Sequence, residues 1–344
     1  MSDTDLMQRV LQLATLGTGS VAPNPLVGCV IVYQDRIIGE GWHKEYGKSH
    51  AEVNAIASVT HLELLADSTL YVNLEPCSHF GKTPPCANLI VEKKIPRVVI
   101  ANLDSNPLVA GRGVQILKNA GIEVKVGVLE QEARYLNRRF FTFMEKKRPY
   151  IILKWAETAD GFIARKDFSS KWISNIHSRT LVHKWRSEEQ AIMIGTNTAY
   201  YDNPQLNVRE WIGRNPIRIL IDKNLNLPLT HHIFDGSQPT FCYNLQKSET
   251  SANLHFIRLD KDFFLENLLQ DLFERKVQSV LVEGGAKLLQ SFIEKNLWDE
   301  ARVFVSQVRF EEGISAPKLP FSAKKVQDVQ GDKLFLYENH FVGK

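Results

Sequence analysis

Four side chains in the first quarter of the chain have the types and the spacing of a catalytic zinc site. His50 is followed two residues later by Glu52, and Cys77 and Cys86 come further along the chain. One imidazole and two thiolates form a zinc ligand set that leaves the fourth position open for a reacting group. Glu52 is not needed as a ligand, but it can take a proton from a zinc-bound water and return it to the substrate. This combination is typical of the zinc deaminases of bases and nucleotides.

A closed zinc knot that only stabilises a loop is the alternative interpretation of the same residues. Such knots usually have four protein ligands, and either His43 or His79 could supply the fourth. A knot gives no role to Glu52, so we favour the catalytic site. Eight residues separate Cys77 from Cys86, where the general deaminase pattern has two. A loop of that length can contact a substrate larger than a free base.

Length and composition limit the remaining possibilities. A chain of 344 residues with 44% hydrophobic and 24% charged residues is expected to form soluble globular domains, about two of them. The net charge of +3 argues against nucleic acid as a partner, but it is compatible with a phosphorylated small substrate. The first residues lack the pattern of a signal peptide, and the longest apolar run, 26–33, is too short to span a bilayer. We therefore expect a cytoplasmic protein without a membrane partner, in which Cys29 and Cys242 are buried free thiols.

The pattern of apolar residues predicts an α/β fold in two domains. A helix over residues 3–16 and a hairpin over 27–42 come first, and strands then alternate with helices up to residue 128. His50, Cys77 and Cys86 are expected at or near helix starts, where free amide groups favour thiolates. The charged run 145–149 is interpreted as a solvated linker between domains at residues 1–146 and 147–344.

The second domain repeats the alternation of strands and helices. Strands are expected over residues 150–155, 191–194, 217–221, 240–243, 256–259, 280–283 and 301–305, and helices over 179–185, 263–275 and 286–295. No G-x-G-x-x-G sequence occurs in this half, so a Rossmann dinucleotide site is not supported. The glycine pair after Glu283 connects a buried strand to a helix, which suits a bound phosphate or a plain tight turn.

Several longer stretches of the sequence resemble the motifs of one enzyme family. They are residues 23–28 (PNPLVG), 50–53 (HAEV), 75–86 (EPCSHFGKTPPC), 104–113, 154–161, 170–173, 195–198, 202–209 and 283–285. Together they resemble the bifunctional riboflavin-biosynthesis deaminase–reductases of the RibD type, and the match covers nearly the whole chain. The resemblance implies a cytidine-deaminase-like three-layer domain followed by a dihydrofolate-reductase-like domain, a fold that binds NADPH without a Rossmann fingerprint.

The resemblance also implies two reactions and the residues that serve them. The first domain would use zinc to deaminate 2,5-diamino-6-(5-phosphoribosylamino)pyrimidin-4-one, and the second would use NADPH to reduce the ribosyl group of the product to ribityl. The implied zinc ligands are His50, Cys77 and Cys86, with Glu52 as the proton shuttle. The implied NADPH contacts are Ala156, Trp172, Thr198, Asp202 and Gly285. The implied substrate contacts are Ser170, Arg186, Leu206, Arg209 and Glu283 in the reductase, and Asn24, His43, His79 and Lys82 in the deaminase. A homo-oligomer formed through the reductase domain is implied as well.

Physical chemistry agrees with these assignments and leaves some choices open. Arg186 and Arg209 carry the guanidinium forks that a ribose 5-phosphate prefers. Without the surrounding resemblance, a surface ion pair would be the favoured interpretation of each arginine. Lys154, Asp160 and Glu283 are equally plausible proton donors for the reduction.

Two other functions compete with the two-step enzyme. A deaminase whose second domain only binds or dimerises would not bind NADPH. A nucleic-acid-editing deaminase would need a basic, aromatic-rich groove, which the small net charge does not favour. We favour the two-step enzyme, because it gives both halves of the chain a role in one pathway.

Overall fold

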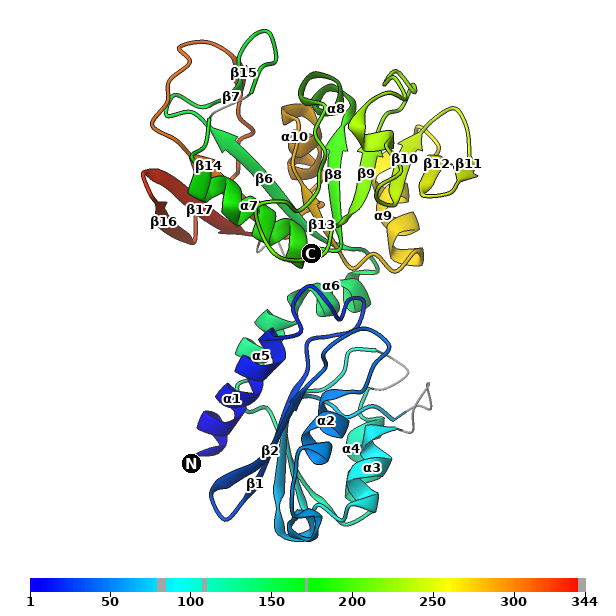
Figure 1. Ribbon diagram of the computed structural model, residues 1–344, viewed down its shortest axis with the longest axis vertical. Helices are drawn as coiled ribbons and strands as arrows, with labels where there is room; N and C mark the ends of the chain where they lie inside the picture. The colour runs from blue at the N-terminus through cyan, green and yellow to red at the C-terminus, as the bar shows by residue number, and fades with distance from the viewer. Residues whose placement is uncertain (79–84, 107–109, 171–172, 340–344) are drawn as a thin grey trace. The chain divides into compact units, whose positions relative to one another are not determined.

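The computed structural model describes residues 1–78, 85–106, 110–170 and 173–339 (Figure 1). The chain divides into two compact units, Met1–Lys147 and Arg148–Lys344. The boundary expected from the sequence lies one residue before this division.

The first unit is built on one five-stranded sheet. Its strand order is β2-β1-β3-β4-β5, in which β1 is antiparallel to β2 and β3, and β3, β4 and β5 are parallel. The elements are α1 (Asp3–Thr15), β1 (Gly28–Tyr33), β2 (Arg36–Trp42), α2 (Ala51–Ala57), the 3-10 helix η1 (Leu62–Asp67), β3 (Thr69–Leu74), α3 (Cys86–Glu92), β4 (Arg97–Asn102), α4 (Arg112–Asn119), β5 (Glu123–Val126), α5 (Glu130–Leu136) and α6 (Arg138–Lys146).

Helices cover both faces of this sheet, which explains the apolar run in β1. Successive side chains of a strand point to opposite faces. Cys29 and Ile31 pack in the core with α2, α3 and α4, whereas Val30 and Val32 pack with α1 and α5. Figure 1 shows α1 and α5 on one side of the sheet and α2, α3 and α4 on the other. The predicted three-layer arrangement is confirmed.

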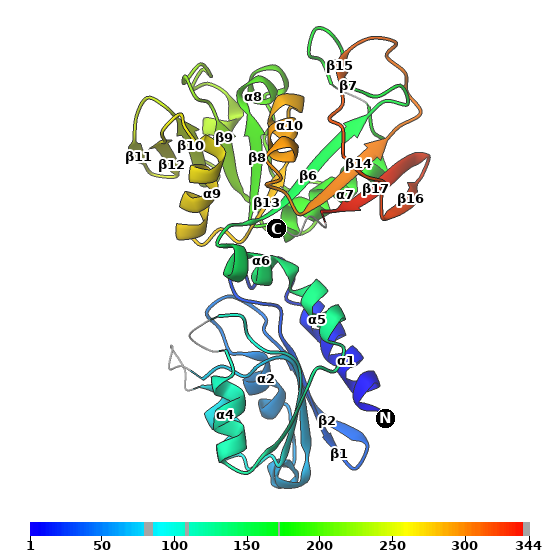
Figure 2. The same ribbon diagram turned by 180° about the vertical axis from the view of Figure 1, so that it is seen from behind.

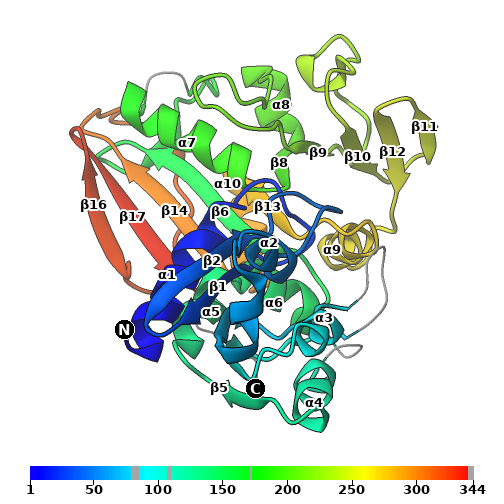
Figure 3. The ribbon, with the colours of Figure 1, turned by 60° about the horizontal axis from the view of Figure 1, so that its bottom comes forward.

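The second unit contains a ten-stranded sheet of order β11-β12-β10-β9-β8-β13-β6-β14-β17-β16. The seven strands from β12 to β14 in this order are parallel, and β11, β17 and β16 are antiparallel to their neighbours. Figure 3 shows the sheet running from β16 at one end to β11 at the other. Its elements are β6 (Tyr150–Glu157), β7 (Phe162–Ala164), α7 (Ile176–Glu188), β8 (Ala191–Gly195), α8 (Thr196–Asp202), β9 (Ile217–Ile221), η2 (His232–Phe234), β10 (Thr240–Asn244), β11 (Glu249–Ser251), β12 (Leu254–Arg258), α9 (Phe264–Glu274), β13 (Ser279–Val282), α10 (Ala286–Glu294), β14 (Glu300–Val305), β15 (Ile314–Ser315), β16 (Lys325–Val329) and β17 (Asp332–Glu338).

The parallel part of this sheet is also buried on both faces. Met193 of β8 faces the core formed with α9 and α10, whereas its neighbour Ile192 faces the core that includes Ala199 of α8. Ile152 of β6 lies on the same face as Ile192, under Val182 of α7. Figure 1 shows α7 and α8 in front of the sheet, and Figure 2 shows α9 and α10 on the opposite face. The carboxyl ends of the parallel strands therefore lie together at one edge, where α/β sheets usually bind ligands.

The run 145–149 differs from the expected solvated linker. Helix α6 continues to Lys146, and the Arg148 side chain is only 12% exposed. Its guanidinium donates to both carboxylate oxygens of Asp299, at 2.5 and 2.8 Å. Arg148 is therefore part of the packed second unit, because the buried carboxylate of Asp299 needs an opposite charge.

Candidate active sites

Three element ends position the predicted zinc ligands in the first unit. His50 is the N-cap of α2, and Cys86 is the first residue of α3. Cys77 follows β3 by three residues, beyond Glu75 and Pro76. The Glu75 carboxylate accepts backbone N–H groups from residues 104, 111 and 114, which holds the end of β3 against the start of α4.

The distances between the three ligand atoms are those of a metal site. His50 Nδ1 lies 3.5 Å from Cys77 Sγ and 3.4 Å from Cys86 Sγ, and all three atoms lie within 4.8 Å of one another. Tetrahedral zinc with Zn–S of about 2.3 Å and Zn–N of about 2.0 Å has an S···N edge of about 3.5 Å. Hydrogen bonds from Cys86 and from His50 lower the pKa of the Cys77 thiol to about 4, which favours the thiolate that zinc requires. The residues present fit a zinc ion.

Glu52 lies beside this group on the first turn of α2. Its side chain is buried, with 3% exposed, and the charges of Cys77 and His50 act on it. Burial raises the pKa of Glu52 to about 7, whereas a divalent cation nearby would lower it. A carboxyl group whose pKa lies near neutrality can accept and return a proton at physiological pH.

His43 is close to the ligand group but cannot serve as a fourth ligand in this arrangement. Its ring lies edge-on to that of His50, with centroids 5.5 Å apart. Nδ1 is 3.0 Å from the carbonyl oxygen of Ser49, and Nε2 is 3.1 Å from Nδ2 of Asn24. Both ring nitrogens are therefore in use. His79 and Lys82 lie outside the described residues. Within the described residues the group has three ligands, as an open catalytic site requires.

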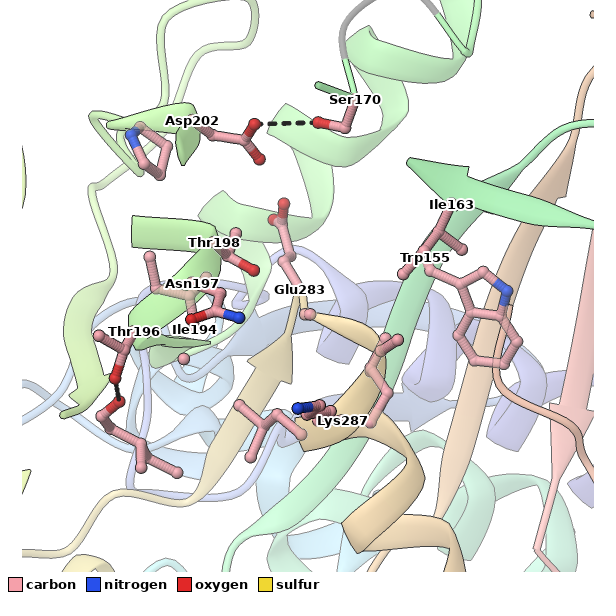
Figure 4. Close-up of a pocket in the computed structure, with 18 of the residues that line it drawn as sticks. Trp155, Ile163, Ser170, Ile194, Thr196, Asn197, Thr198, Asp202, Glu283 and Lys287 are labelled. Atoms are coloured by element: carbon pink, nitrogen blue, oxygen red, sulfur yellow. Dashed lines mark hydrogen bonds between the residues drawn. The ribbon is translucent and has the colours of Figure 1, made fainter. Parts of the chain in front are cut away.

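The second unit contains a large cavity at the carboxyl ends of β6, β8, β9 and β13 (Figure 4). Its volume is about 1560 Å³, which exceeds the volume of a typical drug-sized site. The predicted residues that line it are Ala156, Ser170, Arg186, Thr198, Asp202, Leu206, Arg209, Glu283 and Gly285. Trp172 lies outside the described residues. The structure therefore brings together residues that are spread over 130 positions of the chain.

Glu283 is the electrostatic centre of this cavity. Its two carboxylate oxygens accept from Nε and Nη2 of Arg186 at 2.7 and 2.8 Å, and Lys154 Nζ lies 3.9 Å away. Burial opposes its ionisation, but the charges of Arg186 and Lys154 outweigh burial and lower the pKa of Glu283 to about 2. Burial lowers the pKa of Lys154. Burial also lowers the pKa of the nearby His183, to about 4. Arg186 and Lys154 therefore flank the Glu283 carboxylate, and the imidazole of His183 near them is neutral.

Arg186 and Arg209 differ in their availability for a substrate phosphate. Arg186 also donates Nη1 to the carbonyl oxygen of Asn207, so three of its five N–H groups are in use. The Arg209 side chain is 53% exposed, and Nη1 donates to Oδ1 of Asn207. Arg186 is therefore already paired with Glu283, and Arg209 is the more exposed of the two guanidinium groups; a substrate contact of either residue stays a prediction.

The glycine pair after Glu283 brings the first turns of two helices together. Gly195 at the end of β8 donates its N–H to the carbonyl oxygen of Gly284. A Cβ on Gly285 would lie 3.1 Å from Oγ1 of Thr198, and Gly284 has φ of +119°, which favours glycine. On the other side of the cavity, Ser170 donates to Asp202 at 3.0 Å (Figure 4).

The three candidate proton donors for the reduction differ in whether they line the cavity. Lys154 and Glu283 line the cavity. Asp160 accepts the Thr158 hydroxyl and the N–H groups of Phe310 and Glu311, and it is not among the lining residues. Asp160 therefore stabilises a turn. Thr196, Asn197 and Lys287 also line the cavity although no role was expected for them; the first two lie inside the stretch 195–198 that carried the family resemblance.

Comparison with known proteins identifies the family of both units. The family model for the cytidine and deoxycytidylate deaminase zinc-binding region matches residues 1–102, and that for the RibD C-terminal domain matches residues 149–308. The riboflavin biosynthesis protein RibD of Aquifex aeolicus is 40% identical over 98% of this chain and 99% of its own length. The chain belongs to the RibD family. The RibD protein of Actinobacillus pleuropneumoniae is 39% identical over 100% of this chain and 94% of its own.

Solved structures of RibD proteins share the whole fold. The Thermotoga maritima diaminohydroxyphosphoribosylaminopyrimidine deaminase/5-amino-6-(5-phosphoribosylamino)uracil reductase aligns with a TM-score of 0.89 at 37% identity, covering 98% of both chains. Acinetobacter baumannii RibD aligns with a TM-score of 0.90 at 35% identity, also over 98% of both. The predicted family and fold class are confirmed, and the matched domains imply Zn²⁺ and NADPH as cofactors.

The same matches decide between the alternatives. A RibD reductase domain covers the second unit, so a C-terminal domain that only binds or dimerises is not favoured. The chain is a bifunctional deaminase and reductase of riboflavin biosynthesis. No helix among the described residues is both long enough and apolar enough to cross a membrane.

Proposed function

We propose that the first unit deaminates 2,5-diamino-6-(5-phosphoribosylamino)pyrimidin-4-one and that the second unit reduces the ribosyl group of the product to ribityl. The observation that carries this proposal is the presence, in one chain, of a three-ligand metal group beside Glu52 and of a separate cavity centred on Glu283. The named Thermotoga maritima relative combines the same two activities.

In the deaminase site, we assign His50, Cys77 and Cys86 as zinc ligands and Glu52 as the proton carrier. A zinc ion held there would supply Lewis-acid activation of the attacking water. The Glu52 carboxylate would accept one proton from that water and pass it to a ring nitrogen. It would then carry a second proton, from the hydroxyl group added to the ring carbon, to the departing amino group, so that ammonia leaves and the carbonyl forms. Asn24 and His43 are hydrogen-bonded to each other at the edge of this group, which suits them to position the diaminopyrimidine.

In the reductase site, bound NADPH would supply the hydride that reduces C1 of the ribosyl group. Thr198 and the Gly285 turn lie at helix starts, and amide groups there would hold the cofactor phosphates. Ala156 and Asp202 line the adjoining wall, and Trp172 is assigned by resemblance. Ser170 and Leu206 would contact the substrate.

The charged residues of the reductase site have distinct parts in this proposal. Arg209, which is half exposed, would bind the ribose 5-phosphate. Arg186 would act by fixing the Glu283 carboxylate. Lys154 and Glu283 would orient the ribosyl hydroxyls and supply the proton that accompanies the hydride.

The test is a coupled assay on the purified, zinc-loaded protein. The diaminopyrimidinone ribotide is added first and ammonia is measured, after which NADPH is added and its absorbance at 340 nm is followed. Ammonia release followed by NADPH oxidation is the expected result. Ammonia without oxidation would contradict the reductase assignment, and no ammonia from the zinc-loaded protein would contradict the deaminase assignment.

Arg209→Ala is expected to affect only the reductase. Loss of one charge-assisted phosphate contact should raise the reductase KM for the ribotide roughly tenfold, since such a contact contributes about 1.5 kcal/mol. Ammonia release should stay unchanged. Arg258→Ala, which removes an exposed arginine outside the cavity, is the matched control. Equal losses in both activities of the Arg209 variant would indicate misfolding and contradict a phosphate contact.

We also propose a cytoplasmic homo-oligomer. All four cysteines are free thiols, which suits a reducing compartment. The oligomer, formed through the reductase unit, follows from the family resemblance alone. Light scattering of the purified protein tests it, and a mass of one chain would contradict it.

A further inference from the structure

The loop between α8 and β9 carries two of the residues assigned to the substrate, Leu206 and Arg209. It covers residues 203–216, all of which the structure describes, and it contains no helix or strand. The backbone conformation of such a loop depends on the side chains that bond to it, since no helical or strand ladder fixes its N–H and C=O groups. The contacts that hold the backbone at Arg209 therefore determine where its guanidinium can lie.

Helix α7 holds this loop at two points. His183 and Arg186 lie three residues apart on α7, so their side chains share one face of the helix. Arg186 Nη1 donates to the carbonyl oxygen of Asn207 at 3.2 Å, and the backbone N–H of Arg209 donates to Nδ1 of His183 at 3.3 Å. Both residues of α7 line the cavity. The loop is therefore fixed at the cavity wall by one donor and one acceptor of the same helix.

The two ring nitrogens of His183 face different partners. The imidazole side chain is 4% exposed, and Nε2 lies 3.9 Å from Oε1 of Glu210. Because Nδ1 accepts a hydrogen bond from the Arg209 N–H, it carries no proton, and the proton of a neutral ring is then on Nε2. The Glu210 carboxylate favours this tautomer, since a negative charge beside Nε2 stabilises a proton there. Glu210 therefore helps to leave Nδ1 free as an acceptor.

The surroundings of His183 keep its ring neutral. Burial lowers the pKa of His183 to about 4, and the positive charges of Arg186 and Arg209 act in the same direction. The carboxylates of Glu210 and Glu283 raise this pKa, but by less. At neutral pH, Nδ1 therefore keeps the lone pair that the Arg209 N–H requires. A lysine or an arginine could not replace the imidazole, since neither side chain has an acceptor.

We infer that His183 is a positioning residue of the reductase, which accepts the Arg209 N–H and thereby holds the Arg209 guanidinium at the cavity wall for the substrate phosphate. The inference rests on the proposed contact between Arg209 and the ribose 5-phosphate. The Arg209 side chain is 53% exposed, and its Nη1 donates to Oδ1 of Asn207 in the same loop. An exposed arginine loses conformational entropy when it binds a ligand, so a backbone that is fixed in advance lowers the cost of binding the phosphate.

Two substitutions of similar size separate the hydrogen bond from packing. Asparagine places Oδ1 where histidine has Nδ1, so His183→Asn keeps an acceptor, whereas His183→Leu fills similar space without one. Leucine has the higher helix propensity and suits a buried position better, so a role in stability alone would favour His183→Leu. We expect the reverse order for binding of ribose 5-phosphate, measured calorimetrically on the full-length zinc-loaded protein. His183→Leu should weaken it about three- to tenfold, and His183→Asn should restore it.

A double-mutant cycle tests whether His183 acts through Arg209. Arg209→Ala alone should weaken ribose 5-phosphate about tenfold, as one lost charge-assisted contact does. Adding His183→Leu to this variant should weaken binding no further, because the side chain that His183 positions is already absent. In steady-state assays, His183→Leu should raise the reductase KM for the ribotide and leave kcat, the KM for NADPH and ammonia release unchanged. His177→Leu, at an exposed histidine of α7 outside the cavity lining, is the matched control.

The outcomes separate this inference from the proposed function. Unchanged binding in His183→Leu, equal losses in His183→Leu and His183→Asn, or additive losses in the double variant would overturn the inference. An Arg209→Ala protein that binds ribose 5-phosphate normally would contradict the proposed phosphate contact and the inference together. The expected binding pattern in a protein that does not oxidise NADPH would contradict the reductase assignment while supporting the positioning role of His183.

Discussion

Glu52→Gln should lower the rate of ammonia release by about 10³-fold or more and leave NADPH oxidation unchanged when the deaminated ribotide is supplied. Positioned proton transfer typically contributes 10²- to 10⁴-fold to a rate, and in this reaction Glu52 carries more than one proton. Glutamine keeps the shape of the side chain but cannot accept a proton from water. Ammonia release is measured by single-turnover and steady-state assays on the full-length protein.

Zinc content and folding control this experiment. Glu52 is not a ligand, so the variant should retain one zinc per chain. The Glu52 carboxylate is 3% exposed, and within the part of the chain that the structure describes only the ligand His50 acts on it as a cation. A neutral amide should therefore not lower the free energy of unfolding. Glu63→Gln, a change at a side chain that is 73% exposed, is the matched control and should release ammonia at the native rate. A zinc-loaded Glu52→Gln protein that deaminates normally would remove Glu52 from its assigned role.

The metal group could be predicted from the sequence because each of its residues lies next to a helix or strand whose apolar pattern is recognisable. The apolar run of β1, the strand before Glu75 and the helix after Cys86 are all buried on at least one face. Their patterns therefore locate the ligands within a residue or two. The position of Glu52 follows from that of His50, since both belong to the start of α2.

Side-chain partners that come from distant segments could not be predicted. Glu283 pairs with Arg186 from 97 residues away in the chain, and no sequence pattern indicated that this carboxylate is the partner of that arginine. Asn24 and Ser49 occupy both nitrogens of His43, which removed it as a fourth zinc ligand. The local pattern of apolar residues does not indicate which hydrogen-bond donors and acceptors from distant segments come together in the folded chain.

The elements that the sequence patterns missed bury few side chains. Helix α8 buries only Ala199, and strand β11 buries none of its three residues. The hairpin β16–β17 forms the edge of the large sheet, and all five residues of β16 are at least partly exposed. Edge strands and short surface helices carry no continuous apolar pattern, so hydrophobic periodicity does not detect them. Helix α6 was missed for another reason, because its charged last turn resembled a linker.

Glu283→Gln should be the most damaging single change in the second unit. Among the described residues of the cavity, the Glu283 carboxylate lies within ion-pair distance of both Arg186 and Lys154. Both cations are largely buried, with 11% and 15% of their side chains exposed. Removing one member of a buried ion pair costs about 3–5 kcal/mol, since the remaining charge loses its partner. The reductase should lose at least about 10²-fold in kcat/KM because Glu283 also touches the substrate site, while ammonia release should persist.

The pH dependence distinguishes the lost charge from simple loss of packing. The folded-state pKa of Glu283 is lowered to about 2, below the usual value of 4.5, so its ionised form stabilises the fold above about pH 4.5. This contribution declines as the pH falls toward 2, by about 1.4 kcal/mol for each pH unit.

Urea unfolding followed by tryptophan fluorescence reports mainly the second unit, because only Trp42 lies in the first. The gap between the native protein and the variant should be constant from pH 6 to 8 and about 1 kcal/mol smaller at pH 3.5. Glu249→Gln, which breaks an exposed pair with Lys247, should change stability by less than about 1 kcal/mol at any of these values. A gap that does not depend on pH would mean that Glu283 contributes through its shape and not through its charge.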